Sequence, residues 1–142
     1  MNSTNIDLLK SLRDAIRSCD SSAVESLARQ IFPNPDSFRM TEDAAAIVNS
    51  YHGALEAAER NHNLWFPDMP VNIIDMTPES CGAHGWCVKI NWPYMEWQDS
   101  YTARPPEGYS FHGYADNAAR AWLYADLKAK IAIGGHRVAE AV

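Results

Sequence analysis

Three side chains that could bind a metal ion lie close together, at Cys81, His84 and Cys87. Thiolate and imidazole groups are good zinc ligands, so this spacing suggests a zinc site. A structural zinc site needs four ligands, however, and no second Cys/His pair lies nearby in the sequence. Cys87 also falls inside a predicted strand, where small buried cysteines are common. We therefore expect no metal site and no cofactor.

The same turn holds the best candidate for a catalytic nucleophile. Cys81 could attack a substrate with His84 or His112 as its base, but no cationic residue flanks it to stabilise the thiolate. Glu96 and Asp99 lie among aromatic residues, as the acids of a glycosidase do, yet as isolated acids of a polar segment they are expected to be solvated. The sequence contains no Gly-x-Ser-x-Gly motif and no glycine-rich phosphate loop. We therefore predict that the chain is not an enzyme and has no catalytic residues.

Aromatic side chains are concentrated between residues 86 and 114. Trp86 and Phe111 fit the core of a sheet, but the other rings lie among proline and acidic residues, so several are expected on the surface. Exposed Tyr, Trp and Met side chains anchor protein interfaces. Single-stranded nucleic acid also stacks on rings, but it needs a row of cations, and this segment has only Lys89 and Arg104. The residues predicted to contact a partner are Trp92, Tyr94, Glu96, Trp97, Asp99, Tyr101, Arg104 and Tyr109.

The composition is typical of one globular domain with an acidic surface. The chain has 142 residues, of which 46% are hydrophobic and 21% charged, and its net charge is −6. Such a charge attracts basic partners and repels nucleic acid. No apolar run is long enough to cross a membrane, and the first residues do not have the pattern of a secretory signal. We therefore expect a cytoplasmic protein with reduced cysteines and no contact with membranes or nucleic acid.

The elements that must position these residues follow from the hydrophobic periodicity. The predicted helices cover residues 5–18, 22–32, 41–66 and 116–133, and the predicted strands cover 71–76, 86–92, 94–103 and 109–114. Ser22 with Glu25, Thr41 and Asp116 are the expected N-terminal caps. The glycine pair Gly134-Gly135 is expected to stop the last helix.

This order of elements predicts an α+β fold. A short antiparallel sheet of three or four strands would be covered by the long preceding helix and by the C-terminal helix, as an α-β-α sandwich. The first two helices would form an N-terminal hairpin. The predicted parts are a helical hairpin extension (1–36), the sandwich core (37–135) and a flexible tail (136–142). Because two short helices ahead of a proline-rich joint often pack on a partner, we predict a homodimer through residues 5–32.

Two segments resemble small phage and prophage proteins of the α-β-α sandwich type, namely residues 54–64 and 116–129. In that family a helix leads into a short antiparallel sheet, and the closing helix begins with a motif similar to Asn-x-Ala-Arg-Ala. The matching residues here are Asn117, Ala119, Arg120 and Ala121. The resemblance covers about residues 44–132. It implies a phage-borne accessory role in the cytoplasm of the host cell, and it offers no catalytic residues to transfer.

These observations together predict a non-enzymatic binding protein of phage or prophage origin. Its acidic, aromatic-rich segment would contact a basic host protein or protein complex, as an anti-CRISPR-type inhibitor of host defence would. The alternative is a small-molecule or nucleotide-binding module in which Arg104 meets an anion inside an aromatic cleft. The rings lining that cleft would be Trp92, Trp97, Tyr101 and Tyr109.

Overall fold

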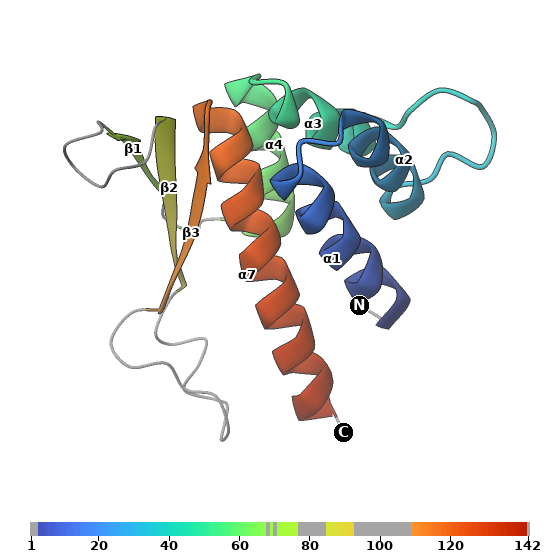
Figure 1. Ribbon diagram of the computed structural model, residues 1–142. Coiled ribbons are helices and arrows are strands. Elements are labelled where there is room, and N and C mark those ends of the chain that lie inside the picture. The colour runs from blue at the N-terminus through green and yellow to red at the C-terminus, as the bar shows by residue number, and fades with distance from the viewer. Residues whose placement is uncertain (1–2, 68, 70, 77–84, 93–108, 142) are drawn as a thin grey trace.

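The computed structural model describes residues 3–67, 69, 71–76, 85–92 and 109–141 of the chain (Figure 1). Within these residues there are five helices and three strands. In chain order they are α1 (Ser3–Arg17), α2 (Ser21–Ile31), α3 (Glu42–Tyr51), α4 (Leu55–Trp65), β1 (Val71–Met76), β2 (Gly85–Trp92), β3 (Tyr109–Ala115) and α7 (Ala118–Ala141). The predicted strand over residues 94–103 lies outside the described residues.

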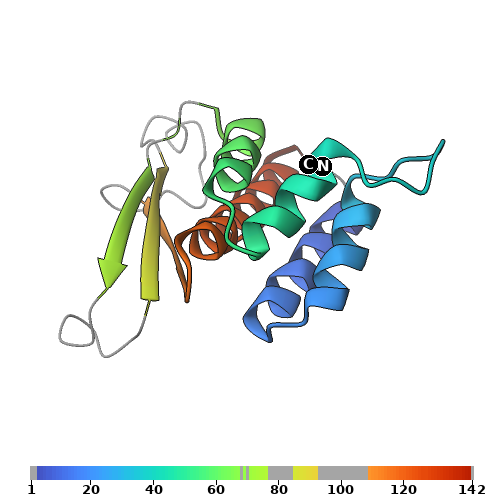
Figure 2. The ribbon, with the colours of Figure 1, turned by 90° about the horizontal axis from the view of Figure 1, so that it is seen from above.

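Helix α7 is the central element of the molecule. It packs on the strands with one side and on α1 and α3 with the other, while α4 packs on it through Ala58 in the same core cluster as the sheet residues (Figure 2). A helix that is apolar all round must be covered on every side. Between Ala118 and Ala129 every side chain of α7 is buried except Arg120, Tyr124 and Lys128, which are partly exposed. This position explains why the helix is so rich in alanine, since small side chains let neighbouring elements approach from both sides.

The sheet is antiparallel with the strand order β1-β2-β3. Its face toward α7 carries buried apolar side chains, among them Val88, Ile90 and Phe111, as the alternating pattern of β2 predicts. Gly113 of β3 pairs with Val88 and lies close to α7. A Cβ atom at Gly113 would lie only 2.0 Å from the carbonyl oxygen of Ala121, so only glycine fits there.

The core has two parts, one on each side of α7. On the sheet side, Trp122 and Ala125 pack with residues of β2 and β3. On the other side, Leu123 and Leu127 pack with α1, α2 and α3. Adjacent residues of α7 therefore pack into two different layers of the core.

The predicted α-β-α sandwich is wrong. The described residues are mostly helical, and their five helices all lie on one side of the sheet (Figure 1). The long helix expected over residues 41–66 is two helices, because the chain turns at Gly53, which has a φ of +111°. The second of these, α4, packs on α7 and α3 and does not cover the outer face of the sheet. The physical reason is that α7 needs apolar cover on both sides, and the earlier helices supply it on the side away from the sheet.

The helix caps have the predicted chemistry, but two of them are other residues than those predicted. Thr41 caps α3 as predicted, since its hydroxyl oxygen accepts a hydrogen bond of 3.1 Å from a backbone N–H of the first turn. Helix α2 is capped by Asp20 and not by Ser22. The cap of α7 is Asn117 and not Asp116, because the Asn117 side-chain oxygen accepts a hydrogen bond of 2.8 Å from the first turn.

The last helix is longer than predicted. It continues through Gly134 and Gly135 to Ala141, so the expected helix stop at the glycine pair is wrong. A glycine inside a helix costs only about 1 kcal/mol relative to alanine, which is too little to end a long helix by itself. Within the part of the chain that the structure describes, no helix, α7 included, has the length and apolar character needed to cross a bilayer.

The first two helices belong to the same core as α7. Leu9, Leu12 and Val24 are buried, and they pack against residues of α3 and α7. A homodimer through residues 5–32 would therefore have to use the other, exposed side chains of these helices. The dimer stays a prediction, and light scattering of the full chain tests it.

Candidate functional site

Most of the residues predicted to contact a partner lie outside the described residues. These are Tyr94, Glu96, Trp97, Asp99, Tyr101 and Arg104. Trp92 and Tyr109 lie in β2 and β3, where they are cross-strand partners at one end of the sheet. The structure therefore leaves the predicted aromatic contact surface as a prediction.

The predicted absence of a metal site concerns a turn that is also outside the described residues. Cys81 and His84 lie there, whereas Cys87 is buried in β2. Among the described residues, no three His, Cys, Asp or Glu side chains come together in a way that could hold a metal ion.

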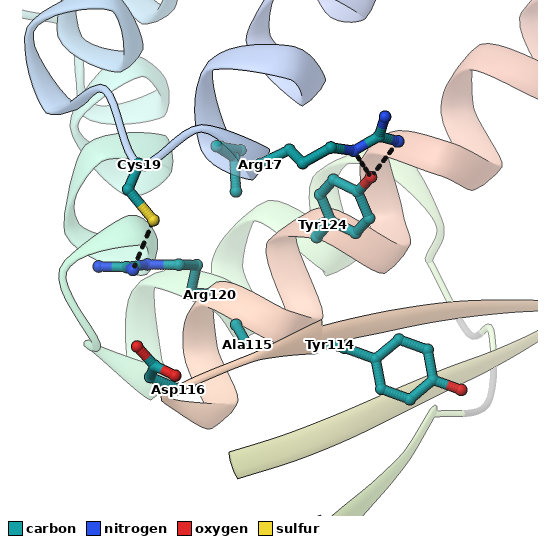
Figure 3. A pocket seen from close by; sticks show the side chains of 8 residues that line it. Arg17, Cys19, Tyr114, Ala115, Asp116, Arg120 and Tyr124 are labelled. Atoms are coloured by element: carbon teal, nitrogen blue, oxygen red, sulfur yellow. Dashed lines mark hydrogen bonds between the residues drawn. The ribbon is translucent and has the colours of Figure 1, made fainter. Parts of the chain in front are cut away.

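A pocket of about 270 Å³ lies where the end of α1, the end of β3 and the first turns of α7 meet (Figure 3). We call it the α1–β3–α7 pocket. Its lining residues are Ile16, Arg17, Cys19, Tyr114, Ala115, Asp116, Arg120 and Tyr124. The lining residues include two arginines, a thiol, a carboxylate and Tyr124, and they come from segments far apart in the sequence.

The end of α1 shapes one wall of this pocket through an unusual backbone turn. The N–H of Asp20 donates to the carbonyl of Ala15 at 2.9 Å, and the N–H of Cys19 donates to the carbonyl of Ile16 at 3.1 Å. This is the Schellman pattern of helix ends, in which glycine usually occupies the left-handed position. Here Cys19 occupies it with a φ of +58°. The turn directs the Cys19 side chain toward Arg120 (Figure 3).

The Arg120 guanidinium is held in place by contacts with α3 and with the turn after α1. Its Nε donates to the backbone carbonyl of Tyr51 at 2.8 Å, and its central carbon lies 4.0 Å from the centroid of the Tyr51 ring. Its Nη1 lies 4.0 Å from the sulfur of Cys19. Because these contacts fix the group before any ligand arrives, Arg120 offers a preorganised positive charge to the pocket.

The second guanidinium, that of Arg17, is held by a tyrosine of α7. Its Nε and Nη2 both donate to the hydroxyl oxygen of Tyr124, at 2.9 Å and 2.6 Å (Figure 3). The hydrogen bond with Tyr124 raises the pKa of Arg17 above its ordinary value, which is already high. The guanidinium group is therefore always charged. Arg17 and Tyr124 are 107 residues apart in the sequence, which explains why sequence reasoning did not connect them.

The charges around the pocket favour an anionic ligand with a donor group. Arg17 and Arg120 provide two positive charges, and Asp116 provides one negative charge. Guanidinium groups bind carboxylate and phosphate groups through paired hydrogen bonds. The ring of Tyr124 supplies apolar surface beside these charges (Figure 3). The pocket is therefore a local positive site on a chain whose net charge is −6.

A separate polar cluster lies inside the core and does not line this pocket. His62 and Asp126 are both buried, and the His62 Nδ1 lies 2.8 Å from a carboxyl oxygen of Asp126. The other ring nitrogen, Nε2, lies 2.9 Å from the carbonyl oxygen of Met69 and donates its hydrogen to it. Trp122 packs against the imidazole, with 5.5 Å between the ring centroids. The cluster ties α4 and the residues after it to α7.

Burial and pairing both act on the protons of this cluster. Burial raises the pKa of Asp126 to about 6, although the hydrogen bond with His62 opposes this shift. Burial disfavours the charged imidazolium of His62, but the hydrogen bond with Asp126 and its charge outweigh burial and raise the pKa of His62. The amide of Asn61 also lowers the pKa of Asp126, although no hydrogen bond of ordinary geometry joins the two side chains. His62 and Asp126 therefore form a buried hydrogen-bonded pair in which both pKa values are raised.

Comparisons of the chain with protein-family models, with curated protein sequences and with solved structures found no match. The resemblance to phage and prophage proteins therefore stays a prediction.

Proposed function

We propose that the chain is a binding module for a small anionic ligand that carries a ring, held in the α1–β3–α7 pocket. The observation that supports this most directly is the convergence of two fixed guanidinium groups, Arg17 and Arg120, on one cavity. An arginine held by protein contacts loses little side-chain entropy when a ligand binds, so more of the interaction energy appears as affinity.

The rest of the pocket restricts the kind of anion that fits. Small-molecule pockets measure roughly 300–1,000 Å³, so a cavity of about 270 Å³ suits a ligand of about the size of a mononucleotide or smaller. Tyr124 offers a ring against which a planar group can pack. Asp116 can accept a hydrogen bond from a hydroxyl or amino group of the ligand. A nucleotide has an anion, a planar ring and hydroxyl groups, and it therefore fits this description.

This proposal keeps the small-molecule function predicted as the alternative but assigns it to different residues. The sequence pointed to Arg104 inside an aromatic cleft, and Arg104, Trp97 and Tyr101 of that site lie outside the described residues. The arginines of the α1–β3–α7 pocket take the role that Arg104 was expected to have.

The experiment is a thermal-shift and calorimetric screen with nucleoside monophosphates, the matching nucleosides and inorganic phosphate. The nucleotides should raise the unfolding temperature, whereas the nucleosides should not. Arg120→Gln should weaken nucleotide binding about tenfold or more, because it removes a charge-assisted contact worth about 1.5–3 kcal/mol. Arg39→Gln removes the same charge from an exposed position outside the pocket and should bind as the wild type does. The absence of stabilisation by any of the anionic compounds would contradict the proposal.

A second candidate function, binding to a host protein, is favoured by the loop between α2 and α3. The side chain of Phe38 in this loop is 100% exposed. The loop is nevertheless held by hydrogen bonds, since Arg29 donates to the carbonyl of Phe38 at 2.8 Å and Asn34 donates to the carbonyl of Arg39 at 3.2 Å. An exposed aromatic side chain on a loop whose backbone is held in place is a common anchor in a protein interface.

Affinity capture of a basic host protein tests this second candidate. We expect a basic protein that is retained by the wild type and lost with Phe38→Ala, because truncation of an anchor costs about 2 kcal/mol or more. Leu64→Ala removes an exposed apolar side chain elsewhere, on α4, and should retain the partner. Equal retention by wild type and Phe38→Ala would exclude Phe38 as the anchor.

A further inference from the structure

One stripe of partly exposed side chains runs along the otherwise buried first part of α7. Between Ala118 and Ala129 it consists of Arg120, Tyr124 and Lys128, spaced four residues apart. Residues at this spacing lie on one face of a helix, and each step advances about 6 Å along its axis. The line along which this part of α7 meets solvent therefore carries two cations with a tyrosine between them.

Tyr124 connects the α1–β3–α7 pocket to Lys128. Its hydroxyl accepts the hydrogen bonds of Arg17, and it lines the pocket. The Lys128 Nζ lies 5.8 Å from the centroid of the same ring, as does the central guanidinium carbon of Arg17. A ligand that leaves the pocket along Tyr124 would therefore meet Lys128 next.

Lys128 is itself fixed by the edge strand. Its Nζ donates to the backbone carbonyl of His112 in β3 at 2.8 Å, and an ammonium group has further N–H bonds for a ligand. Lys89 of β2 is the cross-strand partner of His112, so a second lysine lies in the same area. Burial is the largest cause that lowers the pKa of His112, and the positive charges of Lys89 and Lys128 lower it further. Within the described residues, neither lysine forms a salt bridge with a carboxylate.

We infer that the ligand of the α1–β3–α7 pocket carries a second anionic group, which binds to Lys128 beside Tyr124. This inference rests on the proposed function of the pocket and narrows its ligand to ring-bearing compounds with a chain of anionic groups. Arg120 and Lys128 are about 12 Å apart along the helix axis, and Arg17 lies between them. A nucleoside polyphosphate spreads its charges along such a row, whereas a nucleoside monophosphate reaches only the pocket.

Calorimetric titration with adenosine triphosphate and adenosine monophosphate, both without metal ions, tests this inference. The wild type should bind the triphosphate about tenfold more tightly than the monophosphate, as expected for one added charge-assisted contact. Lys128→Gln should remove this preference and leave monophosphate binding unchanged. Arg120→Gln should weaken the binding of both nucleotides. Lys128→Arg should keep the preference, since it retains the charge, and Lys10→Gln on the exposed side of α1 should bind as the wild type does.

The possible outcomes separate this inference from the proposed function. Equal affinities of the wild type for the two nucleotides would overturn the second anionic site and leave the pocket proposal intact. The same would follow if Lys128→Gln weakened both nucleotides equally. Binding of neither nucleotide would overturn the proposed function and this inference with it.

Discussion

At the scale of single residues, the pair of His62 and Asp126 makes the stability of the fold depend on pH. Both groups have raised pKa values in the folded chain, which for Asp126 means about 6 in place of 3.8. The folded state therefore binds protons more firmly than the unfolded state at these two sites. Linkage then requires that the free energy of unfolding decreases as the pH rises across their titration range.

The prediction at this scale concerns the variant Asp126→Asn. In the wild type, the contribution of Asp126 is fully present below its unfolded pKa and is lost as the pH rises through about 6, and that of His62 is lost at higher pH. Urea unfolding of the wild type should thus show a lower free energy at about pH 8 than at about pH 5. An asparagine can donate to the neutral imidazole as a protonated Asp126 does, so the variant should lose most of this decrease. A wild-type stability that rises over the same interval would contradict the assignment.

Replacement of His62, the other residue of the pair, is the control for the prediction on Asp126. His62→Leu leaves the buried carboxyl of Asp126 without its hydrogen bond, and the loss of one partner of a buried pair costs about 3–5 kcal/mol. We expect this loss to be largest at high pH, where Asp126 would have to be charged. A loss that does not vary with pH would show that the two groups are not coupled.

At the scale of elements, the local sequence predicts where helices and strands occur better than where they end. The alternation of Val88 and Ile90 correctly predicts which face of β2 packs on α7, although Cys87 on the opposite face is buried as well. The amphipathic pattern after Thr41 correctly predicts helix, but not the break at Gly53. Glycine has many conformations available, and the packing of α4 on α7 selects the one that ends α3. Helix ends depend on such contacts because each cap contributes only about 1 kcal/mol.

The prediction at this scale concerns the C-terminal turn of α1. Cys19→Gly should stabilise the fold by roughly 0.5–1 kcal/mol. The left-handed conformation costs a residue with a Cβ atom about 1–2 kcal/mol, which exceeds the roughly 0.4–1 kcal/mol by which glycine favours the unfolded chain. Urea unfolding measures the difference, and Cys19→Ala is the matched control, because it keeps the Cβ atom and should gain nothing. Destabilisation by glycine would mean that the thiol contact with Arg120 outweighs the strain.

At the scale of the whole molecule, α7 decides how the layers are arranged. Its side chains Leu123 and Leu127 are buried by α1, α2 and α3, while Trp122 faces the sheet. Removing either layer would expose a full apolar face of the central helix. The first two helices therefore act in the structure as part of the core, although the sequence analysis placed them in an extension of residues 1–36.

The prediction at this scale is that a chain shortened to begin at Asp36 does not fold cooperatively. It would expose Leu123, Leu127 and Ile47, and each large apolar side chain contributes about 1.5–3 kcal/mol when buried. The loss of three such contributions is comparable with the total stability of about 5–15 kcal/mol of a typical domain. Circular dichroism during heating should show a broad transition in place of a sharp one. A sharp transition near that of the full chain would instead support the predicted division at residue 36.

The sequence by itself determined the local structure of this protein and its acidic, globular character. Hydrophobic periodicity and capping residues act between neighbours in the chain, so they can be read without knowing the fold. The helix predicted over residues 116–133 is present, and its alanines from Ala118 to Ala129 are buried.

Only the tertiary structure decided what covers α7 and where the candidate ligand site lies. The sandwich prediction failed because an apolar face does not specify whether a sheet or a helix will cover it. Arg17, Arg120 and Tyr124 form the pocket only because α1 packs on α7. Contacts between segments about a hundred residues apart depend on which apolar faces meet in the folded chain, and no local pattern records that choice.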